Sequence, residues 1–354
     1  MALGDDTRST PLHLASSNGS PEVVRLLIEH GADVTSRDST RSTPLHLASS
    51  KGSPEIVRLL IEHGADMTSR DDTGSSPLHL ASSNDFPEIA RLLIEHGADV
   101  TSRDGIRSTP LHWASSNSSP KIARLLIEHG ADLNARDRSR STPLHLASTP
   151  VSTPVYSEFV SIKTTRLLLR RMADVKEQRY GFHSRNAEMV QVLLEHGADV
   201  ASRDDTRSTP LHLASSDDFD LPEIVRLLIE HGADVTSRDG NHSTPLHLAS
   251  LNGASKIGRL LIEHGADANA QDRNHNTPLC LALSSLLALS PWQLKTMWLL
   301  IESDVPVYIP DRSHHTSLRL VSSKRSSEIA RLLFRHLAHV ETRRRHFGVS
   351  VKTG

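Results

Sequence analysis

The chain has 354 residues, more than the roughly 100–200 of a typical single domain, which predicts several domains or one extended array. Its 40 Lys+Arg and 42 Asp+Glu give a net charge of −2, and this balance argues against a protein whose main role is to bind nucleic acid. The single cysteine, Cys280, excludes an internal disulfide framework and a zinc site built on cysteine pairs.

The first residues, Met1 to Asp6, lack the basic segment and apolar run of a secretion signal. The longest apolar region, residues 278–301, is interrupted by polar side chains such as Ser284 and Lys295, so it does not qualify as a membrane span. We therefore expect a protein of the cytoplasm or the nucleus.

A seven-residue string, Thr-Pro-Leu-His-Leu-Ala-Ser, recurs along the chain, in most cases every 33 residues. Its copies, some of them altered, begin at Thr10, Thr43, Ser76, Thr109, Thr142, Thr209, Thr244, Thr277 and Thr316. A second string, Leu-Leu-Ile-Glu-His-Gly-Ala-Asp, follows each copy in close variants and also occurs at Leu193–Asp199, where it predicts a truncated repeat without its first helix. The strings together predict ten repeats.

Each repeat reads as two short helices and a hairpin-like tip, as the second repeat illustrates. Thr43 is expected to cap the first helix, and Pro44 stands at its first position, where the missing N–H costs nothing. Gly52 ends this helix, and Ser53 is expected to cap the next one. Gly64 closes the second helix in the left-handed conformation. Such a helix pair cannot bury its own apolar face, so neighbouring repeats must stack.

These features resemble the ankyrin repeat in their 33-residue period, their Thr-Pro-Leu-His-Leu-Ala opening and their Gly-Ala-Asp close, over about residues 5–345. The resemblance implies an all-α repeat solenoid of stacked helix-turn-helix units with short projecting β-hairpin turns. We expect repeats one to mid-five in residues 1–149 and an irregular insertion with a truncated sixth repeat in 150–186. Repeats six to ten with a C-terminal cap are expected in 187–345, and a tail in 346–354. The stack should be weakest, with a local break or bend, near 150–186.

One departure from the family pattern concerns the hairpin turn. The family usually has glycine two residues before each opening threonine, and here only Gly74 fits. Arginine or histidine occupies the other positions, as at Arg41 and His242, so the geometry of the turn is an open question.

Histidine is the residue that most invites a catalytic or metal-binding interpretation. Of the 22 histidines, seven stand in the first string and seven precede Gly-Ala-Asp. A metal or acid–base site would combine His30 with Asp33, or His46 with Asp66. A pattern present seven times is instead typical of a scaffold, in which the first set braces the turn between repeats and the second favours helix C-termini. Cys280 takes a histidine position beside leucines, so we expect a buried, inert thiol.

The sequence contains no phosphate-binding loop, dinucleotide fingerprint, zinc-protease motif or hydrolase elbow. We therefore expect no catalytic residue, no cofactor and no metal.

By the resemblance, a partner protein would contact the hairpin tips and the inner face of the first helices. The candidate contact residues are Arg37, Ser39, Ser42, Lys51, Arg70, Asp72, Ser75, Asn84, Arg103, Ile106, Ser108, Asn117, Arg136, Arg203, Asp205, Ser208, Arg238, Asn241, Leu251 and Trp298. The arginines are the hot-spot type among them, but each could instead pair with a neighbouring aspartate and remain solvated. Trp298 could contact a partner or pack under the nearby insertion, whereas Trp113 replaces a core leucine and is expected to pack.

These observations predict a non-enzymatic scaffold or adaptor that binds another protein as a monomer and binds neither nucleic acid nor a membrane. The alternatives are a substrate-recognition or inhibitory module of a larger enzyme complex, for example a ubiquitin ligase, or the repeat fragment of a longer multidomain protein. The absence of an evident polar N-terminal cap favours the fragment. The repeats are too alike for their surface to identify the partner.

Overall fold

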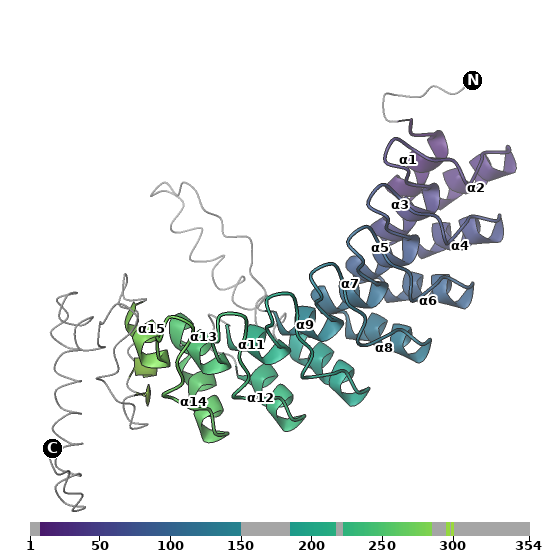
Figure 1. Ribbon diagram of the computed structural model, residues 1–354. Coiled ribbons are helices and arrows are strands. Elements are labelled where there is room, and N and C mark those ends of the chain that lie inside the picture. Colours follow the sequence, from purple (N-terminus) through teal and green to yellow (C-terminus); the bar gives the residue numbers. More distant parts are fainter. Residues whose placement is uncertain (1–7, 150–184, 217–221, 285–294, 298, 301–354) are drawn as a thin grey trace, which may run out of the picture. The chain divides into compact units, whose positions relative to one another are not determined.

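The computed structural model describes residues 8–149, 185–216, 222–284, 295–297 and 299–300 (Figure 1). The chain forms two compact parts, which we describe separately. The N-terminal part comprises residues 1–147 and 153–205, and the C-terminal part comprises residues 148–152 and 206–354. Every regular element in the described residues is a helix, which confirms the expected all-α class, and the tips between repeats are hydrogen-bonded turns without assigned strands.

The N-terminal part is a stack of helix pairs. Its helices are α1 (Pro11–Asn18), α2 (Pro21–Glu29), α3 (Pro44–Lys51), α4 (Pro54–Glu62), α5 (Pro77–Ser83), α6 (Pro87–Glu95), α7 (Pro110–Ser116), α8 (Pro120–Glu128) and α9 (Pro143–Ser148), and residues 185–195 are also helical. The first helices α1, α3, α5 and α7 pack on one another in succession, and so do the second helices α2, α4, α6 and α8 (Figure 1). This arrangement is the stacking that the repeat pattern predicts.

The C-terminal part repeats the same architecture. It contains α11 (Pro210–Ser215), α12 (Glu223–Glu230), α13 (Pro245–Asn252), α14 (Ser255–Glu263) and α15 (Pro278–Ser284), followed by the helical residues 295–297 and 299–300. Here α13 packs between α11 and α15. The expected tenth repeat and tail, together with Trp298, lie outside the described residues. No helix in the described part of the chain combines the length and apolar character that crossing a bilayer requires.

The core lies between the helix pairs, where each repeat contributes the same apolar positions. In the second repeat Leu45, Ala48, Ile56 and Leu60 are fully buried, while the charged side chains of α4 face solvent. The apolar residues recur at helical spacing, so each helix presents one stripe to its neighbours. Because this stripe is covered only when another repeat stacks on it, the fold is stabilised mainly by contacts between adjacent repeats.

The helix ends of the second repeat largely follow the prediction. Thr43 is the N-cap of α3 with extended backbone, Pro44 is its first residue, and Gly52 is its left-handed C-cap with φ of 78°. Gly64 follows α4 with φ of 85°, which confirms the predicted left-handed closure. The expected cap by the Ser53 hydroxyl is corrected, because Ser53 stands at the N-cap of α4 without a side-chain cap hydrogen bond. The backbone of Ser53 also differs from that of Thr43: ψ is 82° at Ser53 and 165°, an extended conformation, at Thr43.

The structure also corrects the repeat count between the fifth and sixth copies of the first string. There the Arg136 side chain donates to the carbonyl of Arg203 at 3.0 Å, and the amide of Asp205 donates to the carbonyl of Ser139 at 2.9 Å. The same two kinds of bond join the hairpins of other consecutive repeats, such as those at Arg103 and Arg136. The two hairpins are therefore immediate neighbours, and no further hairpin intervenes.

The helix over residues 185–195 accordingly completes the fifth repeat and is not part of a separate truncated one. Its Glu188 pairs with Arg124 of α8 at 3.7 Å, and the hydroxyl of Ser118 donates to Asn186. It thus packs next to α8, the position that the second helix of the fifth repeat should occupy. An insertion in the sequence, residues 149–184, separated these two halves. The predicted break or bend near 150–186 falls almost wholly outside the described residues.

Candidate binding surface

The histidine of each first string connects one repeat to the next. In the second repeat, Nδ1 of His46 lies 2.8 Å from the hydroxyl oxygen of Thr43 and accepts the Thr43 backbone N–H at 3.2 Å. Its Nε2 lies 3.1 Å from the carbonyl oxygen of Ser75 in the third repeat. A backbone N–H can only donate and a carbonyl can only accept, so this geometry requires a neutral ring with its proton on Nε2. The predicted bracing role is confirmed.

Burial supports the same neutral form. It lowers the pKa of His46, His79, His112 and His247 below the ordinary value, because a charged imidazole would lose its hydration inside the stack. The hydrogen bond to the next repeat's carbonyl, at Ser75 for His46, opposes this shift but is the smaller effect. Both ring nitrogens are occupied by these bonds, so the rings are held as structural groups.

The second histidine set caps the second helices. Nδ1 of His63 lies 2.8 Å from the carbonyl of Leu59 one turn earlier, and His96 contacts Leu92 in the same way. Since the carbonyl is the acceptor, the imidazole donates to one of the unpaired carbonyls at the helix end, as predicted. Among the described residues, no three His, Cys, Asp or Glu side chains are grouped as metal ligands would be.

Cys280 is the one cysteine of the chain and takes the histidine position in α15. It is 1% exposed, and its Sγ lies 3.4 Å from the hydroxyl oxygen of Thr277. The predicted burial of the thiol is therefore confirmed.

The aspartates of the hairpins hold their own turns. One carboxylate oxygen of Asp38 accepts the backbone N–H groups of Thr40 and Ser42 at 2.8 and 2.9 Å and also the Thr40 hydroxyl. The aspartate after each Gly-Ala step acts similarly, and the hydroxyl of Thr35 lowers the pKa of Asp33 by bonding its carboxylate. These bonds close Asx turns, which explains why the aspartates recur.

The arginines preceding these aspartates span from hairpin to hairpin. The Arg37 side chain donates to the carbonyl of Arg70 at 3.2 Å, Arg70 donates to that of Arg103, and Arg103 to that of Arg136 at 2.6 Å. In the C-terminal part Arg238 donates to the carbonyl of Gln271 at 2.6 Å. For Arg37, Arg70 and Arg103, the alternative of an ion pair with a neighbouring aspartate is thus replaced by a bond between repeats. Whether the arginines also contact a partner stays a prediction.

The hairpin turn keeps its geometry without the family's glycine. Arg41, Arg107 and Arg140 adopt φ of 59°, 65° and 61°, the left-handed region that Gly74 occupies at 77°. His242 does the same at 61° in the C-terminal part. The open question is therefore answered: the non-glycine residues adopt the strained conformation, which costs roughly 1–2 kcal/mol each.

Burial separates the candidate residues into two groups. Ser42, Ser75, Ser108 and Ser208 are 3–8% exposed. The carbonyls of the first three accept Nε2–H bonds from His13, His46 and His79, respectively. These four serines are therefore too buried to contact a partner. The exposed or half-buried candidates, apart from the arginines, are Ser39, Lys51, Asp72, Asn84, Ile106, Asn117 and Asp205 in the N-terminal part and Asn241 and Leu251 in the C-terminal part.

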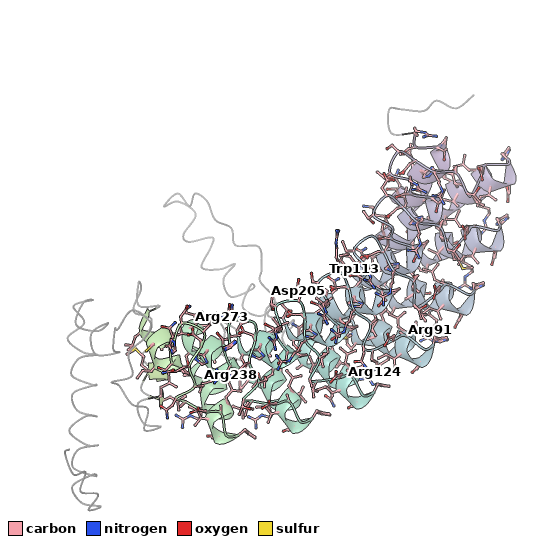
Figure 2. All side chains as sticks on the ribbon, in the orientation of Figure 1. Arg91, Trp113, Arg124, Asp205, Arg238 and Arg273 are labelled. Carbon is pink, nitrogen blue, oxygen red and sulfur yellow. The ribbon has the colours of Figure 1, made fainter. Side chains whose placement is uncertain are left out.

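Trp113 joins this group and corrects the expectation that it packs in the core. It is half-buried, and its indole N–H donates to the carboxylate of Asp104 in the hairpin at 2.9 Å. The corresponding Leu47 and Leu80 are also half-buried, so this helix position is not part of the fully buried core. Figure 2 shows Trp113 on the hairpin side, whereas Arg91 and Arg124 lie on the second helices α6 and α8. We call the exposed hairpins and the helix side facing them the hairpin face.

Sequence-family models agree with this architecture. Models described as ankyrin repeats match residues 37–104, 179–239 and 220–305 for one model, residues 93–147 for a second and residues 12–61 for a third. The chain belongs to the ankyrin-repeat family. Ankyrin repeats are generally protein–protein interaction modules and non-enzymatic binding scaffolds.

Among solved structures, this ankyrin-repeat protein is similar to the ankyrin repeat domain of human ASB11. The two share 23% sequence identity with a TM-score of 0.59, over 73% of this chain and 99% of that one. At this identity the likeness supports the fold alone. A search of curated protein sequences found no match.

Proposed function

We propose that this ankyrin-repeat protein is a non-enzymatic scaffold or adaptor that binds a partner protein through its hairpin face. The observation that carries the proposal is a division of labour among the side chains. The repeated histidines, aspartates and arginines bond neighbouring repeats or their own turns, as His46, Asp38 and Arg103 do. Several hairpin side chains that differ from repeat to repeat, such as Asp72 and Ile106, are exposed on the hairpin face.

Three exposed hairpin residues show this variation. Asp72, Ile106 and Asp205 are exposed, while the second repeat carries Ser39 or Thr40 at the matching positions. A surface that varies on a constant scaffold is what a specific protein contact requires, because an invariant surface would not distinguish partners.

Affinity capture tests the proposal. The tagged chain is incubated with a lysate of its native cells beside a hairpin-face variant carrying Asp72→Lys, Ile106→Ser and Asp205→Lys, and bound proteins are identified by mass spectrometry. The control variant, Glu62→Lys with Glu95→Lys, makes the same charge change on the second helices. We leave the arginines in place because their loss would remove bonds between repeats.

The proposal expects a discrete protein that the control variant retains and the hairpin-face variant loses. A protein lost equally from both variants, or only from the control, would contradict it. Measurable turnover by the purified chain that disappears on changing Cys280 or one histidine would contradict the non-enzymatic role.

A further inference from the structure

One place on the hairpin face departs from the repeating pattern in several residues at once. Trp113 stands in α7 where the neighbouring repeats have Leu47, Leu80 and Leu146. Aromatic side chains, and Trp above all, dominate binding energies at protein interfaces. In every other described first helix of this part, the residue at the matching position is leucine. The tryptophan is therefore specific to the fourth repeat.

The indole is held in a fixed orientation. Its N–H donates to one oxygen of Asp104 at 2.9 Å, and the other oxygen of Asp104 accepts the backbone N–H groups of Ile106 and Ser108 at 3.0 and 2.8 Å. Asp104 itself is 8% exposed. An aromatic side chain that is already ordered loses little entropy when a partner covers it, which favours its use as an anchor.

An exposed apolar side chain lies in the same hairpin turn, whose backbone N–H groups bond to the Asp104 carboxylate. Ile106 is 48% exposed, and the matching residues are threonines, Thr40 and Thr73, in the two preceding repeats. The backbone of Ile106 and the ring of Trp113 are bonded to the same aspartate. The fourth repeat therefore presents an apolar residue at the turn and an aromatic ring beside it.

The charge around these two residues is positive. The hairpins 103–107 and 136–140 together carry five arginines and two aspartates, whereas the hairpin 70–74 carries one arginine and two aspartates. The two hairpins are adjacent, since the amide of Arg138 donates to the carbonyl of Ile106 at 2.8 Å. Arg107, Arg138 and Arg140 are exposed, and an acidic ligand would meet them directly.

We infer that Ile106, Arg107, Trp113, Arg138 and Arg140 form a basic aromatic patch that docks an acidic protein segment carrying a bulky apolar residue. The arginines attract the acidic side chains, while Trp113 and Ile106 receive the apolar one. The inference rests on the proposed function and assigns its contact to one location and one partner chemistry. All five residues belong to the N-terminal part, so the patch does not depend on the C-terminal part.

The test uses fluorescently labelled synthetic peptides and measures their binding to the full chain by anisotropy. The main probe is a short run of glutamates around a central Leu-Phe pair. The comparison probes replace that pair by two serines, replace the glutamates by glutamines, or replace them by lysines. We expect the main probe to bind most tightly, binding to weaken as salt is raised, and the lysine peptide not to bind.

The variants take residues that other repeats already carry at the same positions, so that the fold is retained. These are Trp113→Leu, as in Leu80, Ile106→Thr, as in Thr73, and Arg138→Ser, as in Ser39. Each should weaken binding of the main probe, Trp113→Leu by at least about tenfold. The matched control, Arg91→Ser, removes an exposed arginine from the second helix α6, as Arg138→Ser does in the patch, and should not weaken it.

The outcomes separate this inference from the proposed function. If none of the peptides binds while lysate capture still depends on the hairpin face, the patch is wrong and the proposed function stands. The glutamate peptides with Leu-Phe and with Ser-Ser could also bind equally well, with no effect of Trp113→Leu. That result would contradict the claim that Trp113 receives an apolar side chain of the partner. Tighter binding of a labelled oligothymidylate than of the main probe would assign the patch to nucleic acid instead.

Discussion

At the scale of single residues, the repeat carries buried hydroxyls that the fold does not use. The serine that ends the first string is buried in α1, α3, α5, α7, α9, α11 and α13. Six of these seven serines have no hydrogen-bond partner in the described residues: Ser16, Ser49, Ser115, Ser148, Ser215 and Ser250. The equivalent Ser82 instead donates to the carbonyl of Leu78 at 2.8 Å. A buried polar group without a partner carries an uncompensated desolvation cost.

Removing such a hydroxyl should therefore stabilise the protein. We expect Ser49→Ala and Ser115→Ala each to raise the free energy of unfolding by about 1 kcal/mol, measured as a shift of the urea midpoint at constant m. Ser82→Ala is the matched control, because it removes a satisfied hydroxyl and should be neutral or destabilising. Equal effects at all three positions would show that the hydroxyls of Ser49 and Ser115 are bonded after all.

A second residue-scale prediction concerns the left-handed turn positions. Arg41 has φ of 59°, so Arg41→Gly should relieve backbone strain and stabilise the chain by up to about 1 kcal/mol. The control Arg58→Gly, in the exposed middle of α4, should destabilise by about 1 kcal/mol because glycine is unfavourable in a helix. Denaturant melts measure the free energy of unfolding of both variants. A lower value for Arg41→Gly than for the unchanged protein would contradict the claim that Arg41 is strained.

The converse exchange, Gly64→Val, isolates the conformational cost alone. Gly64 has φ of 85°, and a Cβ built there meets no atom within 4 Å, so no clash contributes. We expect Gly64→Val to lose more than the 1 kcal/mol or so that a helix cap contributes, in the same melts. A neutral effect would mean that the left-handed closure of α4 is not required.

At the scale of the elements, the histidine bridge makes the stack sensitive to acid. The pKa of His46, His79 and His112 is lowered by burial in the folded chain, so the unfolded chain binds more protons as the pH falls below about 6.5. Stability is therefore fully present above that pH and is lost as the pH falls toward the folded-state pKa. The loss is at most about 1.4 kcal/mol per pH unit for each histidine.

The prediction is tested by urea melts between about pH 7.5 and pH 5.5. A variant with His46, His79 and His112 all changed to Gln should be less stable at the higher pH, because the bonds to the next repeats are lost. Its stability should nevertheless fall less steeply with decreasing pH. Glutamine at the third helix position can still bond the N-cap amide, so the helix start survives. Parallel slopes in the two proteins would contradict the buried-histidine account.

The same scale shows how far the sequence predicts this fold. The helix boundaries, the core stripe and both histidine roles follow from spacing alone, because the same residues recur at the same positions in successive repeats. The capping partnership between Thr43 and His46 was also present in the three-residue spacing, but histidine is not the usual glutamate or glutamine of that motif. The prediction for Trp113 was wrong because the leucine position was interpreted as core, although Leu47 and Leu80 are only half-buried.

At the scale of the whole molecule, sequence spacing was an unreliable guide where chain was inserted. The helix at residues 185–195 looked like a separate repeat because its partner α9 ends before residue 149. Only the three-dimensional bonds, such as Arg136 to Arg203, show that the adjacent hairpins belong to consecutive repeats. The sequence gives the order of the elements, but it does not show which helices form one repeat when an insertion separates them.

The sequence predicted only in part which side chains are exposed on the proposed binding surface, for a similar physical reason. The location of the hairpin face followed from the family resemblance, yet the sequence could not separate side chains that serve the scaffold from those left exposed. Ser75 and Arg103 hold neighbouring repeats together, whereas Asp72 and Ile106 are exposed. The residue types alone do not distinguish these roles, because each depends on what the next repeat places nearby.

The central claim is that a partner protein contacts the hairpin face, and site-specific photocrosslinking tests it most directly. A photoreactive amino acid replaces Asp72 on the hairpin face in one variant and Glu62 on a second helix in another, both exposed. The account predicts that irradiation in native lysate couples a discrete protein to the first variant and not to the second. Crosslinks from position 62 with none from position 72 would contradict it.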